Sequence, residues 1–224
     1  MHLFRRSALA GIMIGAFRSA SAHFIELIVS TPRTAFTNGA GYRAFTLSNQ
    51  NLTATSGSGY FNSVFASNPK ASGKWYAEIK IPVLSTNTAV GIAAPDFYTY
   101  DDLGAQFASV GYYPVSPATA IYFNNVQITG GSVSDTNGAV VRIAVDVGMK
   151  MIWFSSPAMT GVGNKWNNSA IANPATGVGG VSFIGINTGP YYLAVNAHEA
   201  GNVFTINTIP PFTGAVPAGF RPWN

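Results

Sequence analysis

The sequence predicts an all-β protein, an antiparallel β-sandwich that follows an N-terminal arm. The length of 224 residues suits one sandwich-sized domain, or one domain plus an arm. The composition includes 24 Gly and 13 Pro residues, which is typical of a turn-rich β protein. After residue 30, no segment of helical length is amphipathic, whereas short apolar runs alternate with Gly, Asn, Ser and Pro. Hydrophobic residues at 47% argue against disorder.

Runs of β-branched and aromatic residues predict the individual strands. Turn signals such as Asn124-Asn125 and Asn137-Gly138 separate these runs. Residues 48–59 are rich in Ser, Thr, Asn and Gly, and they are expected to form a loop. The expected strands are Tyr42–Leu47, Trp75–Val83, Ala89–Ala94, Ala108–Tyr113, Ala120–Phe123, Ala139–Val147, Met151–Ser155, Val181–Ile186, Tyr192–Ala197 and Val203–Asn207.

Two of the runs alternate well enough to predict which residues share a face. In the first run, Ala77, Ile79 and Ile81 lie on one face, and Glu78 and Lys80 lie on the other. In the second run the inward residues are Val141, Ile143, Val145 and Val147.

The net charge of +4 belongs to the N-terminal region and not to the predicted sandwich. Residues 1–45 hold five of the 12 basic residues and one of the eight acidic ones, a balance of +4. The remaining seven basic and seven acidic residues cancel. A nucleic-acid-binding domain needs a clustered basic face, so the charge distribution argues against such a partner.

Residues 1–22 are open to two interpretations. A basic start, an apolar stretch of ten residues (Ala8–Phe17) and the small residues Ala20–Ala22 match the parts of a secretory signal. The apolar stretch is too short to span a bilayer, which takes about 20 residues. The same segment suits a docking arm over residues 1–35. In that case the contacts with an assembly partner are expected from Leu3, Phe4, Arg5, Arg6, Ile12, Ile14 and Phe17.

Three segments carry a resemblance to a known family. The first is Ser72–Ile79 (SGKWYAEI), followed by Val90–Ala93 (VGIA). The second is Asn137–Asp146 (NGAVVRIAVD) with Met151–Phe154 (MIWF), and the third is the closing Pro210–Trp223 (PPFTGAVPAGFRPW). In order and spacing these segments resemble the SPRY domain, in its divergent bacterial and phage branch. The resemblance covers about residues 60–224 and implies a bent two-sheet sandwich, binding through loops at one end of the sheets, and no enzymatic activity. The sandwich domain as a whole is expected over residues 36–224.

The chain offers little for catalysis, and no catalytic residue, metal site or cofactor is expected. Cys is absent, and the three His residues are His2, His23 and His198. No strained Gly-x-Ser-x-Gly turn is present for a nucleophile. The acidic cluster Asp96, Asp101 and Asp102 is the one place where a carboxylate pair for glycan cleavage or a Ca²⁺ site remains open.

A ligand-binding rim is expected from aromatic and amide side chains around these acids. Tyrosine supplies flat contact area with a hydrogen-bonding end, and Asn-rich loops would suit the hydroxyl groups of sugars. The residues expected in the rim are Asp96, Tyr98, Tyr100, Asp101, Asp102, Tyr112, Trp166, Asn167 and Asn168.

The pattern of charge also predicts self-association. Residues 103–134 and 166–198 hold no charged side chain when His is counted as neutral, and such surfaces favour a homo-oligomer. The leading hypothesis is a non-enzymatic bacteriophage virion protein, a decoration or adhesion module. Its arm would bind other capsid or tail proteins, and its sandwich would bind a host-surface glycan or protein. The alternative is a secreted bacterial carbohydrate- or protein-binding module with residues 1–22 as its signal peptide.

Overall fold

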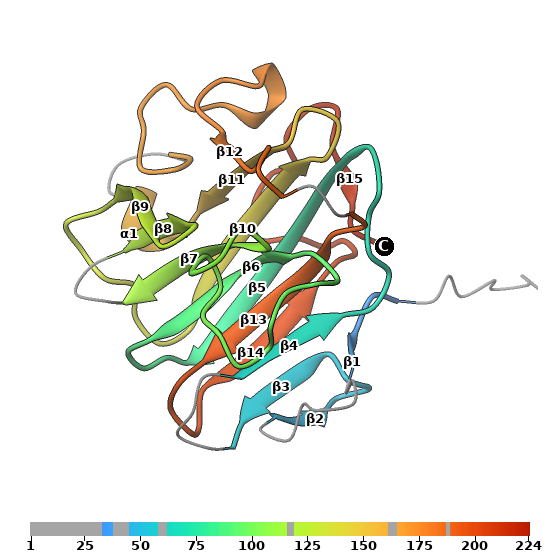
Figure 1. Ribbon diagram of the computed structural model, residues 1–224, viewed down its shortest axis with the longest axis vertical. Coiled ribbons are helices and arrows are strands. Elements are labelled where there is room, and N and C mark those ends of the chain that lie inside the picture. The colour runs from blue at the N-terminus through green and yellow to red at the C-terminus, as the bar shows by residue number, and fades with distance from the viewer. Residues whose placement is uncertain (1–32, 38–44, 58–61, 116–118, 161–164, 187–188) are drawn as a thin grey trace, which may run out of the picture. The chain divides into compact units, whose positions relative to one another are not determined.

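The computed structural model describes residues 33–37, 45–57, 62–115, 119–160, 165–186 and 189–224. The expected arm residues from Leu3 to Phe17 lie outside the described residues. Fifteen strands are described, and they are assigned to two sheets (Figure 1). Every strand pair is antiparallel except one, so the predicted all-β antiparallel sandwich is confirmed.

The first sheet has seven strands. In spatial order they are β1 (Phe36–Thr37), β4 (Asn62–Ala66), β13 (Tyr192–Ala197), β6 (Thr88–Ala93), β7 (Ser109–Val115), β8 (Ala120–Phe123) and β9 (Val126–Gly130).

The second sheet has eight strands. Seven follow the order β12 (Val181–Ser182), β11 (Met151–Ser155), β10 (Ala139–Asp146), β5 (Lys74–Val83), β14 (Val203–Asn207), β3 (Thr53–Ser56) and β2 (Phe45–Ser48). The eighth, β15 (Arg221–Pro222), pairs in parallel with β5. The helical elements described are one turn of α-helix, α1 (Pro157–Thr160), and one 3₁₀ turn, Pro174–Thr176.

The main core lies between the two sheets, and the alternation in the sequence identifies its residues. Ala77, Ile79 and Ile81 of β5 are fully buried in it, as predicted. The same core contains the inward residues predicted for β10 and the residue after it, which are Val141, Ile143, Val145 and Val147. The first sheet contributes side chains such as Val90 and Ile92 from the opposite side.

The expected loop over residues 48–59 is wrong, because part of it forms strand β3. Leu52, Ala54 and Ser56 alternate inward, whereas Thr53 and Thr55 are only half-buried. Ala54 and Ser56 are small, so the hydrophobic alternation is weak in the sequence, although the burial of these residues follows a period of two.

Other differences concern short strands. Strands β1, β4, β9 and β15 were not expected, and the expected strand Val181–Ile186 is only two residues long. After Ser182 the chain turns, because the amide of Ile186 donates to the carbonyl of Phe183 at 2.9 Å. These strands are two to five residues long, which is too short to show a clear alternation.

Both outer faces of the sandwich are covered by chain segments. The loop cover, residues 94–108 between β6 and β7, packs Phe97 and Leu103 onto the outer face of the first sheet. The C-terminal cover, residues 210–224, packs Phe220 and Phe212 onto the outer face of the second. Residues 165–180 extend this second cover through Trp166 and Ala172. The sandwich therefore has three layers of buried apolar side chains.

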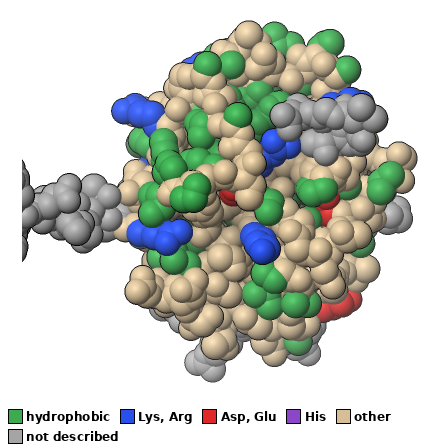
Figure 2. All heavy atoms as spheres, turned by 180° about the vertical axis from the view of Figure 1, so that it is seen from behind, with side chains coloured by type: hydrophobic (Ala, Val, Ile, Leu, Met, Phe, Trp, Pro, Cys, Tyr) green, Lys and Arg blue, Asp and Glu red, His purple; other side chains and the backbone are tan. Residues whose placement is uncertain are grey.

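The face seen in Figure 2 carries its Lys and Arg side chains as separate spots among hydrophobic and uncharged ones. No continuous basic surface is visible on the described residues of this face. Such a surface is what a nucleic-acid-binding domain would present.

Candidate binding site

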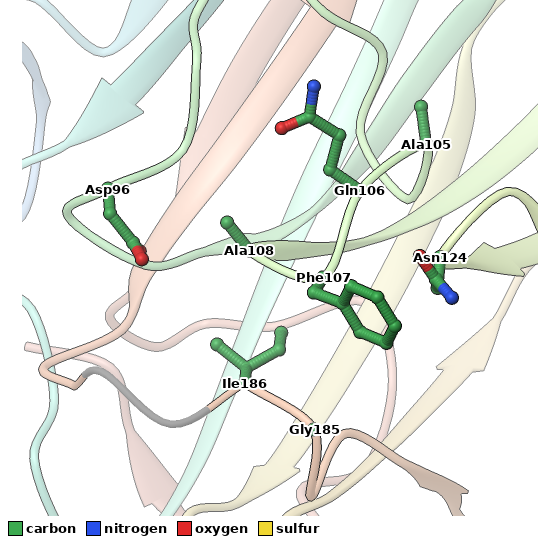
Figure 3. A pocket seen from close by; sticks show the side chains of 8 residues that line it. All are labelled: Asp96, Ala105, Gln106, Phe107, Ala108, Asn124, Gly185 and Ile186. Carbon is green, nitrogen blue, oxygen red and sulfur yellow. The ribbon is translucent and has the colours of Figure 1, made fainter.

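A hollow of about 770 Å³ opens where three connections of the fold meet. The loop cover supplies Asp96 and the run Ala105–Ala108, and the turn between β8 and β9 supplies Asn124. Gly185 and Ile186, from the connection between β12 and β13, complete the lining (Figure 3). Segments distant in the sequence therefore form one site.

Backbone hydrogen bonds fix these segments to one another. The amide of Ala94 donates to the carbonyl of Ala108 at 2.8 Å, which ties together the two ends of the loop cover. The amide of Asn125 donates to the carbonyl of Gly104 at 2.8 Å and so joins the β8–β9 turn to the same loop. These bonds hold two of the three walls against each other.

The third wall is held by a partly buried polar cluster. The carbonyl of Ile186 accepts from the ammonium of Lys150 at 3.1 Å and from the hydroxyl of Tyr191 at 2.9 Å. The Lys150 ammonium also lies 4.5 Å from the centre of the Tyr191 ring. Burial lowers the pKa of Lys150 from its ordinary value. Lys150 therefore positions the backbone of residues 185–186.

Phe107 is the principal apolar group of the hollow. It is 59% exposed, although its ring contacts Phe123 edge-on, with centroids 6.0 Å apart and an interplanar angle of 83°. Gly185 lies against both rings: a Cβ there would be 3.2 Å from Phe123 and 3.5 Å from Phe107. One side of the Phe107 ring is thus supported by protein, and the rest is open to a ligand (Figure 3).

Amide and carboxylate side chains surround this ring. Gln106 and Asn124 lie on two sides of it and Asp96 lies across the hollow, and no Lys or Arg occurs among the described residues of the lining. The Gln106 amide nitrogen donates to Asp101, whose other carboxylate oxygen accepts from the amide of Asp102 at 2.9 Å. Asp101 therefore orients a lining residue without lining the hollow itself.

Asp102 faces a different and smaller pocket of about 180 Å³, together with Tyr113, Tyr122 and Asn125. Burial, and then the nearby charge of Asp101, raise the pKa of Asp102 to about 7. Its buried Oδ1 has no hydrogen-bond partner among the described residues. Asp96 and Asp102 consequently line separate pockets, and the three acids do not form a facing pair for glycan cleavage.

The tyrosines of the loop cover are exposed but lie outside the hollow. Tyr98 is 60% exposed and Tyr100 is 50% exposed, with ring centroids 5.5 Å apart. The carbonyl of Thr99, between them, accepts from the amide of Ser63. Of the residues expected in the binding rim, Asp96 is therefore the one that lines the hollow.

Two further residues expected in the rim are structural, which corrects the interpretation. Tyr112 is fully buried in the main core, where its hydroxyl donates to Asp135 at 2.5 Å. Trp166 is 8% exposed and packs in the cover over the second sheet. Both rings are withdrawn from the surface, so neither offers a face to a ligand.

The amide pair Asn167-Asn168 is divided between the interior and the surface. The side chain of Asn167 accepts from the amide of Phe154 at 2.7 Å and donates to the carbonyls of Ile152 and Gly179. It is 5% exposed, so its expected role in ligand binding is also corrected. Asn168 is exposed, and its side chain donates to the carbonyl of Gly130 at 2.6 Å.

Sequence reasoning did not find Phe107, Gln106, Asn124 or Gly185. A signal was present in the case of Phe107, because it lies just before an expected strand in a segment without charge. The hollow itself depends on three distant connections, which no local pattern reveals.

The described ranges offer no group of three or more His, Asp or Glu side chains that could hold a metal ion. The same ranges contain no helix with the length and apolar character needed to cross a membrane.

No family model matches the sequence, and no curated protein matches it. Solved structures do match. The SPRY domain of human HERC1 aligns with a TM-score of 0.52 at 17% identity, over 72% of this chain and 91% of that one. The fold is SPRY-like. The PSpry domain of TRIM65 aligns with a TM-score of 0.56 at 14% identity, over 78% of this chain and 91% of that one.

The segments that carried the resemblance occupy central places in the SPRY-like fold. Ser72–Ile79 leads into and forms much of β5, and Asn137–Asp146 with Met151–Phe154 forms the hairpin of β10 and β11. Pro210–Trp223 supplies most of the C-terminal cover. The predicted SPRY-like fold is thus confirmed, whereas its phage branch stays a prediction.

Proposed function

We propose that this protein is a non-enzymatic binding module that captures a partner in the hollow around Phe107. The observation that carries the proposal is the large exposed aromatic ring at the centre of a preformed concave site. Binding sites are commonly concave, partly apolar and lined by a few fixed polar groups. The solved SPRY domains share the fold, and binding through connecting loops is what the family resemblance implies for this chain.

The arrangement of the carboxyl groups supports a role without catalysis. Asp101 is engaged by Gln106 and by the amide of Asp102, and Asp102 lines a pocket separate from that of Asp96. Glycoside cleavage requires two carboxyl groups on opposite sides of one bond. The acids of the loop cover do not meet that requirement.

The proposed setting is a virion, with the sandwich displayed on a capsid or tail by the N-terminal arm. Support comes from the basic and apolar sequence of residues 1–30 and from the resemblance to phage-type members. The other candidate is an exported binding module, which the signal-like residues 1–22 favour. Self-association through uncharged surface belongs to the same proposal.

A truncation tests the arm. Thr34 donates through its hydroxyl to the carbonyl of Trp223 at 2.7 Å, so the deletion should spare this residue and end at Ser30, where the chain divides into two units. In the virion setting, the protein lacking residues 1–30 should unfold at the same denaturant concentration as the full chain but be missing from purified particles. Immunoblots of the particles measure its incorporation.

Intact-mass analysis of the native protein decides between the two settings. A full-length chain in particles supports the virion proposal. A chain that begins at His23 in the culture supernatant contradicts it and supports export. Incorporation of the truncated protein at full occupancy would contradict the docking arm.

A further inference from the structure

We infer that the hollow binds an uncharged glycan, with the Phe107 ring as the platform for one sugar and with Gln106, Asn124 and Asp96 as partners for its hydroxyl groups. This inference rests on the proposed function, because it names the ligand class of the same site. Its basis is the combination of an open aromatic ring, flanking amides and a carboxylate, and the absence of Lys and Arg from the described lining.

The Phe107 ring has the support that a stacking platform requires. Phe123 and Gly185 hold one side of the ring, so it has a firm backing while 59% of the residue remains accessible. A sugar ring presents C–H groups on one face and hydroxyl groups around its edge. Stacking of the C–H face on Phe107 would bring the hydroxyl groups toward the polar side chains of the lining.

The polar side chains fit hydroxyl groups in number and type. The amide of Asn124 offers donors and an acceptor, and that of Gln106 offers an acceptor and the N–H that does not point to Asp101, whereas a carboxylate such as Asp96 accepts from hydroxyl groups. Asp101 holds the amide nitrogen of Gln106, which fixes the orientation of that side chain. Because a hydroxyl group can both donate and accept, the several hydroxyl groups of a sugar can pair with amide and carboxylate side chains alike.

The charge of the site selects an uncharged glycan over an acidic one. Asp96 is the one charged residue among the described lining residues. A carboxylate or phosphate on the ligand would find no cation in this described lining to pair with. The hollow is therefore unsuited to hexuronates and other anionic sugars.

Preorganisation makes the proposal physically reasonable for a weakly interacting ligand. The bonds from Lys150 and Tyr191 to Ile186, and from Asn125 to Gly104, hold the walls in place. A rigid site loses little conformational entropy on binding, so modest stacking and hydrogen-bond contacts suffice for measurable affinity.

The test is an NMR titration of the ¹⁵N-labelled full-length chain with neutral oligosaccharides of glucose, galactose and mannose. We expect at least one of them to shift the amide signals of Phe107, Asn124 and Gly185. Phe107→Ala should weaken that binding roughly ten-fold. Tyr98→Ala is the matched control, because it removes an equally exposed ring of the same loop from outside the hollow. It should change affinity less than about two-fold.

A second titration uses a hexuronate oligomer of the same length, which should bind about ten-fold more weakly because the described lining has no cation to pair with its carboxylates. Equal affinity for the acidic oligomer, or equal losses from Phe107→Ala and Tyr98→Ala, would overturn the glycan proposal. A third titration, with a pool of uncharged peptides, distinguishes an error in the ligand class from the absence of a binding site. If the peptides shift the hollow and no sugar does, the ligand class is wrong but the binding site stands. If neither shifts it, the proposed function falls as well.

Discussion

The two covers of the sandwich each close the outer face of a sheet, but they differ in how the carboxyl group that each one buries is hydrogen-bonded. Each cover lays aromatic side chains on the outer face of a sheet, and each encloses one acidic residue. Under the C-terminal cover this residue is Glu78, and under the loop cover it is Asp102. The contrast between them indicates which cover is a structural closure and which one belongs to a site.

Glu78 is 2% exposed and its carboxylate is well satisfied. It accepts hydrogen bonds from the Tyr76 hydroxyl at 2.8 Å and from the amides of Thr213 and Gly214 at 2.9 and 2.8 Å. Two of these donors belong to the C-terminal cover. Glu78 therefore fastens that cover onto β5, and its desolvation is offset by charge-assisted bonds.

Asp102 has no equivalent set of partners. Its Oδ1 is buried without a hydrogen bond in the described structure, and burial and Asp101 raise its pKa. The loop cover thus holds a carboxyl group that burial disfavours in its ionised form, next to the segment that lines the hollow. Unsatisfied buried polar groups concentrate at functional sites, where specificity or rearrangement outweighs stability.

Removal of the Glu78 carboxylate should produce the largest effect. Glu78→Ala leaves three donors without their acceptor, and we expect a loss of about 3 kcal/mol in the free energy of unfolding. Glu78→Gln keeps the shape and one oxygen, so it should lose roughly half as much. Urea unfolding followed by tryptophan fluorescence measures both variants. If Glu78→Ala is as stable as the original chain, then apolar packing alone holds the C-terminal cover.

The neighbouring asparagines allow a sharper comparison of an interior and a surface amide on the extended second cover. Asn167 and Asn168 have similar positive φ angles, 47° and 52°, so replacement by Ala adds similar backbone strain at both positions. Their side chains differ, because Asn167 makes two buried hydrogen bonds and one partly buried bond, whereas Asn168 makes one at the surface. Asn167→Ala should therefore be about 2 kcal/mol more destabilising than Asn168→Ala. Equal losses would show that strain, and not hydrogen bonding, decides.

The strands of the core were predictable because their signal is local. The alternation in β5 and β10 follows from one face that meets the core, and a few residues suffice to show it. The two covers were not predictable in this way. The rings of Tyr76 and Trp153 on the outer face of the second sheet are buried by segments that follow much later in the chain. The alternation predicted that Glu78 and Lys80 share a face, but only the tertiary structure shows that Glu78 is covered and Lys80 exposed.

The candidate site shows the same division between local and non-local information. Composition predicts a binding rim around the acidic and aromatic loop, and Asp96 of that loop does line the hollow. Composition could not separate Tyr112, which is directed into the core, from Phe107, which lies outside it, because both are aromatic residues near the ends of one expected strand. The uncharged segments also have an explanation within the chain, since residues 103–108 and 166–180 contribute to the covers.

A pH dependence linked to Asp102 tests the same contrast between the two covers. Its pKa in the folded protein is raised to about 7, above that of an exposed carboxyl group, so between about pH 4 and 7 the folded state binds more protons than the unfolded state. Stability linked to this group is therefore highest at the acidic end of that window and declines as the pH rises through 7. Asp102→Asn removes the titration, and the difference in unfolding free energy between the two chains should shift in favour of the variant with rising pH. Urea unfolding at pH 5 and at pH 8 measures the shift. If the difference in unfolding free energy is the same at both pH values, Asp102 Oδ1 is solvated in the folded as well as the unfolded protein. Asp102 and Glu78 would then differ only in their hydrogen bonds.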